Sequence, residues 1–332
     1  MPKVSIIIPI FNAESCLIRA VESCLAQSFS DFEVILVDDK SVDKSLQIAL
    51  AFSMRDSRVI VVENPRNLGT FLARKNGAQI ANGKFIVFLD ADDYLRPNAL
   101  EILCDLADKN RADMVHCGII TEPFLPHSTK PKIHTQTLEN DAILGKIFVC
   151  DFKKSWLIVC GKMFSANLMR HALKKLEFID CHLISSEDSL LFFMLCALAQ
   201  KSVGTRESLY IYTQNLNSLL KSKEPTIIAK QVADRASIRY SLRKHLAHFR
   251  NDSDLAKNRY FEQSLQNLCD LMDYFICYSM RFLDSRDLDS HNLGKKSRIS
   301  PYIKYSILSF RFVARWQIAV KLAIFLLTRK KL

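Results

Sequence analysis

The feature that most constrains the fold is an apolar run near the N-terminus, from Val4 to Ile10, in which β-branched residues predominate. A strand with one buried face alternates apolar and polar residues, whereas a near-continuous apolar run indicates a strand covered on both faces. Strands of this kind belong to parallel sheets whose connections are helices. The sequence therefore predicts an α/β protein with helices on both faces of a mostly parallel sheet.

The alternation of strand and helix patterns continues through the first ~120 residues. Strands are predicted at 4–10, 32–37, 58–62, 85–89 and 112–120, with helices at 14–27, 69–80 and 98–108 and another that begins near residue 43. Ligands of open parallel sheets bind beyond the carboxyl ends of the strands. Three polar segments fall there, and we expect them to form the binding site: Pro9–Asn12, Asp38-Asp39 and Asp90–Asp93.

Beyond residue 120 the pattern is mixed. A polar loop is predicted at 127–137, helices at 140–152 and 187–198, and a short apolar segment at 156–164. Residues 226–282 are predicted to be helical and carry no motif that we connect with chemistry. The chain is thus divided into segments 1–120, 121–222, 223–290 and 291–332, of which the third is mainly helical.

The net charge of +11 is concentrated at the end of the chain. After Asp289 there are ten basic residues and no acidic one. Residues 1–289 therefore contain 36 of the 46 basic residues and all 35 acidic residues. The body is therefore close to neutral, and the overall charge does not by itself predict a nucleic-acid-binding protein.

The basic tail interleaves aromatic residues with its charges, and Lys304, Arg311 and Arg315 would share one face of a helix. We favour an amphipathic helix that lies on an anionic membrane surface. A helix docked on the body with solvated charges and a nucleic-acid surface are the alternatives, and no nucleic-acid partner is predicted.

Cysteine usage and hydropathy bear on the compartment. The ten cysteines show no C-x-x-C pair and several lie in apolar helical patterns, which favours reduced, small hydrophobic side chains. The sequence shows no secretory signal and no apolar stretch near the ~20 residues of a membrane span. We therefore expect a cytoplasmic protein.

Carboxylates gather at the end of the predicted strand 85–89, in the string Leu89-Asp90-Ala91-Asp92-Asp93. Like charges at the end of a buried strand repel one another and are costly to desolvate unless a cation compensates them. A hard divalent cation would do so and would keep coordination positions for phosphates. Hydrogen bonding of Asp92 or Asp93 to backbone amides of the following turn is the alternative.

Two further segments carry candidate ligands. Asp39 follows the second strand and is a candidate acceptor of hydrogen bonds from a nucleobase or ribose, whereas Asp43 is interpreted as a helix cap. Asn67–Gly77 opens a helix after a glycine, and a helix N-terminus favours anions. Arg74 is placed to reach a diphosphate or a base, and a solvated side chain is the alternative.

The order and spacing of these segments resemble the inverting glycosyltransferases of family 2, which share the GT-A fold. The strings that carry the resemblance are Val4–Asn12, Ser23–Ser28 with Phe32–Asp39, Asn67–Gly77 and Phe88–Asp93. A looser match continues through Trp156–Phe164, Ser186–Phe192, Tyr210–Tyr212 and Asn217-Ser218. This longer pattern is similar to bacterial lipooligosaccharide and capsule β-glycosyltransferases, including β-1,3-galactosyltransferases. Cys160 departs from it, because a Trp or another bulky residue is common at that position.

The resemblance implies that segment 1–120 binds a UDP-sugar donor and that segment 121–222 binds the acceptor. Asp90-Ala91-Asp92 corresponds to the family's D-x-D motif, so Asp92, assisted by Asp90 or Asp93, would hold Mn²⁺ or Mg²⁺ against the diphosphate. The donor contacts that the resemblance implies are Pro9, Phe11, Asn12, Asp39, Arg74, Asp90, Ala91 and Asp92.

Glu187-Asp188 corresponds to the family's E-D motif. The resemblance implies that Asp188 is the general base, with Glu187 as the second candidate; from the residues alone, interaction with the helix N-terminus is the alternative. The implied reaction is one in-line displacement that moves a hexose or N-acetylhexosamine to a saccharide acceptor in a bacterial surface glycan. A lipid-linked acceptor would agree with attachment to the cytoplasmic face of the inner membrane.

Two other functions remain open. A nucleotide-sugar-binding protein without catalysis would have no need of Asp188. A nucleotidyltransferase would also use a metal, but it usually carries a glycine-rich phosphate loop near the N-terminus, and 9–15 contains no glycine.

Overall fold

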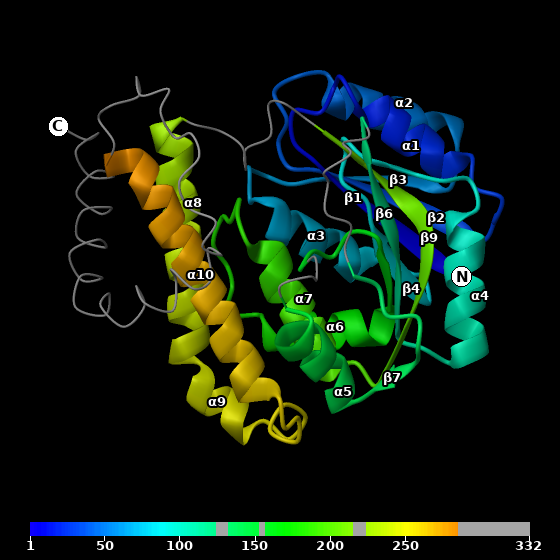
Figure 1. Ribbon diagram of the computed structural model, residues 1–332. Coiled ribbons are helices and arrows are strands. Elements are labelled where there is room, and N and C mark those ends of the chain that lie inside the picture. Colours follow the sequence, from blue (N-terminus) through cyan, green and yellow to red (C-terminus); the bar gives the residue numbers. More distant parts are fainter. Residues whose placement is uncertain (124–131, 153–156, 215–223, 285–332) are drawn as a thin grey trace.

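The computed structural model describes residues 1–123, 132–152, 157–214 and 224–284 (Figure 1). Within them nine strands form one sheet, in the order β3-β2-β1-β4-β8-β6-β9-β5, with β7 paired to β9 beside this path. The strands are β1 (Val4–Ile10), β2 (Phe32–Asp38), β3 (Val59–Glu63), β4 (Phe85–Phe88), β5 (Tyr94–Leu95), β6 (Met114–Glu122), β7 (Leu138–Glu139), β8 (Lys162–Ser165) and β9 (Lys201–Thr213).

The first half of the sheet is parallel, as predicted. β1 lies between β2 and β4, with Val4 opposite both Phe32 and Phe85, and β3 continues the parallel order beyond β2. All residues of β1 and β2 are buried except Pro9, which is partly exposed. The apolar run therefore correctly predicted a central strand covered on both faces.

The second half of the sheet is mixed. β8 is antiparallel to both of its neighbours, β4 and β6, whereas β9 runs parallel to β6 and antiparallel to β5 and β7. The sequence did not predict β8 or β9. β9 is interrupted by the exposed pair Arg206-Glu207, and the β6–β9 register shifts at Gly118, where an added Cβ would lie 2.8 Å from the Arg206 carbonyl oxygen. This irregularity removes the simple alternation by which a strand is recognised.

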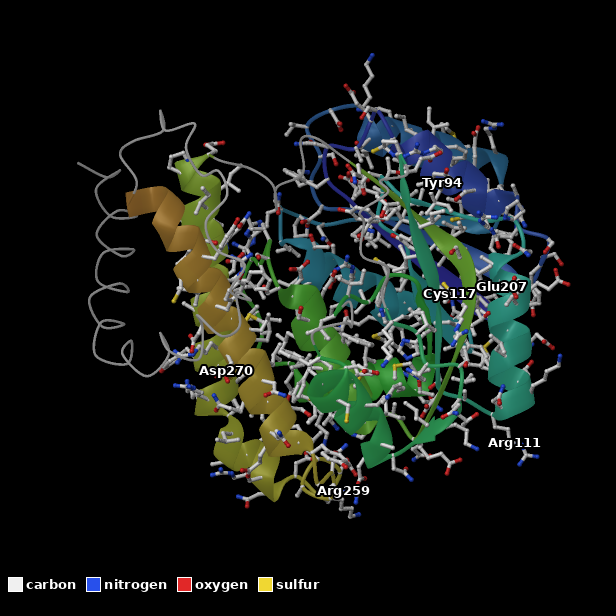
Figure 2. All side chains as sticks on the ribbon, in the orientation of Figure 1. Tyr94, Arg111, Cys117, Glu207, Arg259 and Asp270 are labelled. Carbon is white, nitrogen blue, oxygen red and sulfur yellow. The ribbon has the colours of Figure 1, made fainter. Side chains whose placement is uncertain are left out.

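Helices cover both faces of the sheet (Figure 1). α1 (Leu17–Leu25), α2 (Ser45–Arg55) and α4 (Ala99–Asn110) lie on one face, and α3 (Thr70–Ile80), α6 (Ala166–Lys175) and α7 (Glu187–Leu198) lie on the other. The short helix α5 (Asp141–Leu144) continues into the π-helix η1 (Gly145–Cys150). Side chains fill the space between helices and sheet (Figure 2).

The C-terminal described region is helical, as predicted, but it is divided. It consists of α8 (Pro225–Lys244), α9 (Leu246–Asn251) and α10 (Phe261–Asp284). His245 alone separates α8 from α9, and a non-helical segment at 252–260 separates α9 from α10. α8 and α10 pack lengthwise, and α10 also contacts η1 and α7 (Figure 1). Phe249 and Phe261 join the same hydrophobic core as Phe193 of α7.

Among the helices that the structure describes, none is both long and apolar enough to cross a bilayer. None of the ten cysteines, all in described segments, forms a disulfide bond. Trp156, Asn217, Ser218 and the basic tail 291–332 lie outside the described residues. The division into four segments stays a prediction.

Candidate active site

The loops that follow β1 and β2 are joined by hydrogen bonds between them. Asn12, whose φ is 52°, donates its backbone N–H to Ser41 Oγ at 3.1 Å and accepts at Oδ1 from the Val42 amide at 2.9 Å. Asparagine is one of the few residues that adopt a positive φ readily. Phe11 precedes it with 47% of its surface exposed, which is unusual for a phenylalanine in this otherwise buried strand region. The segment Pro9–Asn12 therefore presents an aromatic ring at the carboxyl edge of the sheet.

Asp39 organises the loop that leads into α3. Its carboxylate is buried and accepts from Asn64 Nδ2 and from the amides of Leu68 and Gly69, each at 2.8 Å. These bonds satisfy amide donors near the start of α3. A direct contact between Asp39 and a donor nucleoside stays a prediction. Asp43 accepts from the amides of Ser45 and Glu14, but it lies one position before the N-cap of α2, which is Lys44, so its interpretation as the helix cap was wrong by one residue.

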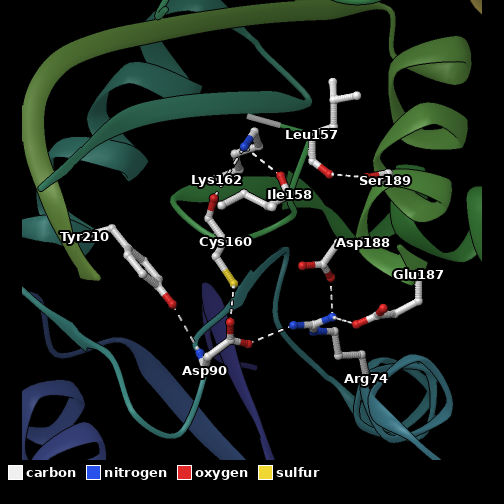
Figure 3. A network of polar contacts seen from close by, with 10 residues as sticks. All are labelled: Arg74, Asp90, Leu157, Ile158, Cys160, Lys162, Glu187, Asp188, Ser189 and Tyr210. Atoms are coloured by element: carbon white, nitrogen blue, oxygen red, sulfur yellow. Dashed lines mark hydrogen bonds and ion pairs between the residues drawn. The ribbon is translucent and has the colours of Figure 1, made fainter. Parts of the chain in front are cut away.

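Arg74 of α3 is the centre of the site (Figure 3). Its side chain is only 3% exposed, so the alternative of a solvated arginine is wrong. One guanidinium nitrogen, Nη2, contacts Asp90 Oδ1 at 2.7 Å. The other, Nη1, donates to Asp188 and lies 3.5 Å from Glu187 Oε1. One cation thus joins the carboxylate at the end of β4 to two carboxylates at the start of α7.

This arrangement shifts the pKa values of Arg74, Glu187 and Asp188. Burial lowers the pKa of Arg74, but Asp188 and Asp90 outweigh it and hold that pKa well above its usual value. Burial, and then the charge of Asp188, raise the pKa of Glu187 to about 8. Burial also raises the pKa of Asp188, although Arg74 opposes this. Burial and mutual repulsion therefore favour a proton held between Glu187 and Asp188 near neutral pH.

The remaining carboxylates of the acidic string differ in environment. Asp93 is 1% exposed, and its oxygens accept from Tyr210 OH at 2.5 Å and from the Thr213 amide at 2.8 Å. Asp90 and Asp92 are partly exposed at the open end of β4. Arg19 fixes the turn, because its guanidinium donates to the Asp92 carbonyl oxygen at 2.7 Å and to Thr213 Oγ1 at 2.8 Å. It also lies 4.9 Å from the centroid of Tyr94, which Figure 2 labels beside α1.

These environments bear on a divalent cation. In the described part of the chain no group of three or more His, Cys, Asp or Glu side chains is already gathered in a metal-binding arrangement. Asp93 is buried and its oxygens accept from Tyr210 and the Thr213 amide of β9, not from backbone amides of the turn that follows it. Asp90 and Asp92 are partly exposed beside the open end of β4, and Asp90 could bind a cation by exchanging its contact with the Cys160 thiol. A hard cation held by two carboxylates keeps positions for phosphate oxygens. The residues present therefore fit a divalent cation, with Asp92 and Asp90 as better ligands than Asp93.

Sequence reasoning assigned no role to three side chains of this site. Tyr210 of β9 bridges the acidic turn, since its hydroxyl accepts from the Asp90 amide at 3.3 Å and donates to Asp93. Cys160 donates its thiol to Asp90 Oδ2 at 3.4 Å. Lys162 is buried, and its ammonium donates to the carbonyl oxygens of Ile158 and Cys160 (Figure 3). The β-branched and aromatic run around Tyr210 was the signal that could have revealed β9.

Comparison with known proteins identifies the family. The model of Glycosyl transferase family 2 matches residues 5–172. The uncharacterized glycosyltransferase EpsJ of Bacillus subtilis is 32% identical over 226 residues, which are 66% of this chain and 63% of that protein. The chain thus spans less than two thirds of that relative's length.

Solved structures show the same fold. The S. aureus TarS fragment 1–349 in complex with UDP-GlcNAc gives a TM-score of 0.56 at 20% identity, over 82% of this chain and 81% of that one. The mannosyltransferase PcManGT from Pyrobaculum calidifontis in complex with GDP-Man and Mn²⁺ gives 0.52 at 12% identity, over 98% and 85%. The fold is therefore GT-A, and since the family model covers half of the chain, this protein belongs to glycosyltransferase family 2.

Proposed function

We propose that this chain is an inverting, metal-dependent glycosyltransferase that moves a hexose or N-acetylhexosamine from a UDP-sugar to a saccharide acceptor. The observation that carries the proposal is the buried Arg74, which brings Asp90 at the donor side together with Asp188 at the start of α7. A transferase of this kind needs a carboxylate at the departing diphosphate and another at the attacking hydroxyl. A protein that only binds nucleotide sugars has no need of the second.

The donor and the cation are supported by the structural neighbours. TarS was solved with UDP-GlcNAc, and the Pyrobaculum enzyme was solved with GDP-Man and Mn²⁺. In this chain Asp92 and Asp90 would hold Mn²⁺ or Mg²⁺, which supplies Lewis-acid stabilisation of the departing nucleoside diphosphate. Phe11 offers an aromatic ring to the base, and Pro9, Asn12, Asp39 and Ala91 would line the same side.

Asp188 acts as the general base. Burial and the charge of Asp188 raise the pKa of Glu187 to about 8, whereas Asp188 accepts a hydrogen bond from Arg74, which favours its ionised form. The acceptor hydroxyl gives its proton to Asp188 as its oxygen bonds to the anomeric carbon. The bond from that carbon to the diphosphate oxygen breaks in the same step, so the anomeric configuration inverts.

We further propose that the acceptor belongs to a bacterial surface glycan such as lipopolysaccharide, lipooligosaccharide or capsule, and that it is lipid-linked. The basic tail would then attach the protein to the cytoplasmic face of the inner membrane. These proposals rest on the sequence resemblance and the composition of the tail, which lies outside the described residues.

The test is a panel of UDP- and GDP-sugars with Mn²⁺, in which release of free nucleoside diphosphate is measured. One donor should be consumed by the wild type but not by Asp92→Ala. Asp105→Ala is the matched control, because Asp105 is an exposed carboxylate on α4. Proton NMR of the product should show a β linkage from an α-linked donor. Release of pyrophosphate, or retention of configuration, would refute the proposal.

A further inference from the structure

The segment that delivers Glu187 and Asp188 adopts a backbone conformation that its own sequence does not favour. Ser186, immediately before α7, has φ 68° and ψ 5°, and its side chain makes no capping bond to the helix. A serine in the left-handed region costs free energy and persists only where its surroundings impose that conformation. The elements that pack against residues 182–186 therefore impose this conformation.

One face of α8 supplies three polar contacts to this segment. Lys230 Nζ donates to the His182 carbonyl oxygen at 2.6 Å. Asp234 Oδ2 accepts from the Ile184 amide at 2.7 Å. Alternate residues of the segment are therefore held by side chains one helical turn apart, and Lys230 and Asp234 also form an ion pair.

The third contact comes from Arg235, whose Nε donates to Ser186 Oγ at 3.3 Å. Arg235 is buried, its Nη1 donates to Ser279 Oγ of α10 at 3.1 Å, and its guanidinium lies 5.0 Å from the centroid of Phe275. Burial lowers its pKa to about 10, although Asp234 and Glu187 oppose this. Buried charged side chains destabilise a helix pair unless they are well bonded, and packing alone would be better served by apolar residues.

The opposite side of the segment is bounded by the donor half of the site. A Cβ added to Gly69 would lie 2.7 Å from the Leu183 carbonyl oxygen and 2.9 Å from its nitrogen. Gly69 is itself held by Asp39 at the start of α3, the helix that carries Arg74. Residues 182–186 are thus confined between the α3 entry and the buried face of α8.

We propose that Asp234 and Arg235 are positioning residues, which fix residues 182–186 so that Glu187 and Asp188 meet Arg74. The inference rests on the proposed function, and it gives the helical region a role in the reaction. Displacement of a catalytic group by about 1 Å can cost on the order of 100-fold in rate. Loss of the hydrogen bonds from Asp234 or Arg235 to residues 182–186 should therefore lower kcat while donor binding is preserved.

The test compares Arg235→Met with Arg235→Lys and Arg239→Met. Methionine keeps much of the apolar packing of the arginine stem but donates no hydrogen bond. Arg239 is the matched control, because it lies one turn along α8 and pairs with Asp273 of α10 at 2.8 Å. Its loss weakens the same helix pair and leaves Lys230, Asp234 and Arg235 in place to hold 182–186.

Arg235→Met should lower kcat at least about tenfold, with the KM for the donor and the affinity for UDP with Mn²⁺ unchanged within about twofold. Arg235→Lys should recover most of the loss, and Arg239→Met should keep wild-type kcat. An equal loss of kcat in Arg239→Met would overturn the proposal, as would an unchanged kcat in Arg235→Met or a parallel loss of UDP binding.

Hydrogen exchange of the peptide that covers 182–188 gives a second readout that needs no turnover. Exchange should be faster in Arg235→Met and in Asp234→Ala than in the wild type or in Arg239→Met. An unchanged exchange rate in both variants would show that Asp234 and Arg235 do not hold this segment, and it would overturn the proposal. A wild type that turns over no donor would refute the proposed function and the catalytic role of α8, and exchange would still decide whether α8 fixes the segment.

Discussion

Replacing Arg74 by methionine removes the guanidinium that contacts Asp90, Glu187 and Asp188. Arg74 is 3% exposed, so water does not replace it freely, and three carboxylates are left without their shared cation. Breaking a buried ion pair by removing one partner costs about 3–5 kcal/mol of unfolding free energy. The loss of kcat should reach at least about 100-fold, because an uncompensated Asp188 binds a proton and no longer serves as a base.

The stability loss should depend on pH with a definite sign. Without Arg74 the pKa values of Glu187 and Asp188, already raised by burial, rise further above those of the unfolded chain, so the folded state binds more protons than the unfolded state. Stability then falls as pH rises, and the difference from the wild type should grow between about pH 5 and about pH 8. At the acidic end the carboxyl groups are neutral in the folded protein and need no cation.

Urea denaturation followed by circular dichroism measures this effect, with Arg58→Met as the matched control. Arg58 also pairs with an aspartate, Asp56, at 2.7 Å, but both side chains are partly exposed. Surface pairs contribute about 0–1 kcal/mol. The reasoning would be refuted by an Arg74→Met loss no larger than that of Arg58→Met, or by a loss that does not change with pH.

Three further predictions concern neighbouring residues. Asp92→Asn should weaken Mn²⁺ binding in the presence of UDP at least about tenfold, whereas Asp93→Asn should weaken it less than about threefold. Electron paramagnetic resonance of free Mn²⁺ measures both affinities, and equal losses would contradict our assignment of ligands. Gly69→Ala should lower the unfolding free energy by about 1–3 kcal/mol, because φ is 85° and the new methyl group meets the Leu183 backbone; an unchanged denaturation midpoint would contradict this. The pKa of Glu187 is raised to about 8 from 4.5, so the wild type loses stability from this group as pH rises from about 4.5 through about 8. Glu187→Gln should make the unfolding free energy less dependent on pH and should keep most of the activity at pH 7. If the stability of this variant followed the wild-type pH curve, the raised pKa of Glu187 would be disproved.

Local sequence patterns predicted the donor half well, because its strands are encoded by short apolar runs. β1, β2, β3 and β4 begin and end within about two residues of their predicted bounds. The carboxylates that follow β2 and β4 lie at the same edge of the sheet because the strands are parallel and adjacent to β1. Strand periodicity and topology rules therefore sufficed to gather Asp39 and Asp90 near one site.

The rest of the site depends on contacts that are remote in sequence. Arg74 and Asp188 are separated by 114 positions, and nothing near Arg74 indicates that α7 will cover it. Asp92 and Asp93 are equivalent in the string, and only the pairing of β9 with the acidic turn distinguishes them. The contacts of Asp234 and Arg235 with 182–186 arise from helix packing, which the hydrophobic pattern of α8 did not reveal.

The most direct test of the central claim separates donor binding from transfer in Asp188→Asn. Asparagine keeps the shape of the side chain but accepts no proton under these conditions. With the donor identified in the panel, calorimetry should give wild-type affinity within about threefold, and the rate of product formation should fall at least about 100-fold. A variant that transfers sugar at the wild-type rate, with donor affinity also unchanged, would contradict the assignment of Asp188 as the base and with it our account of the site.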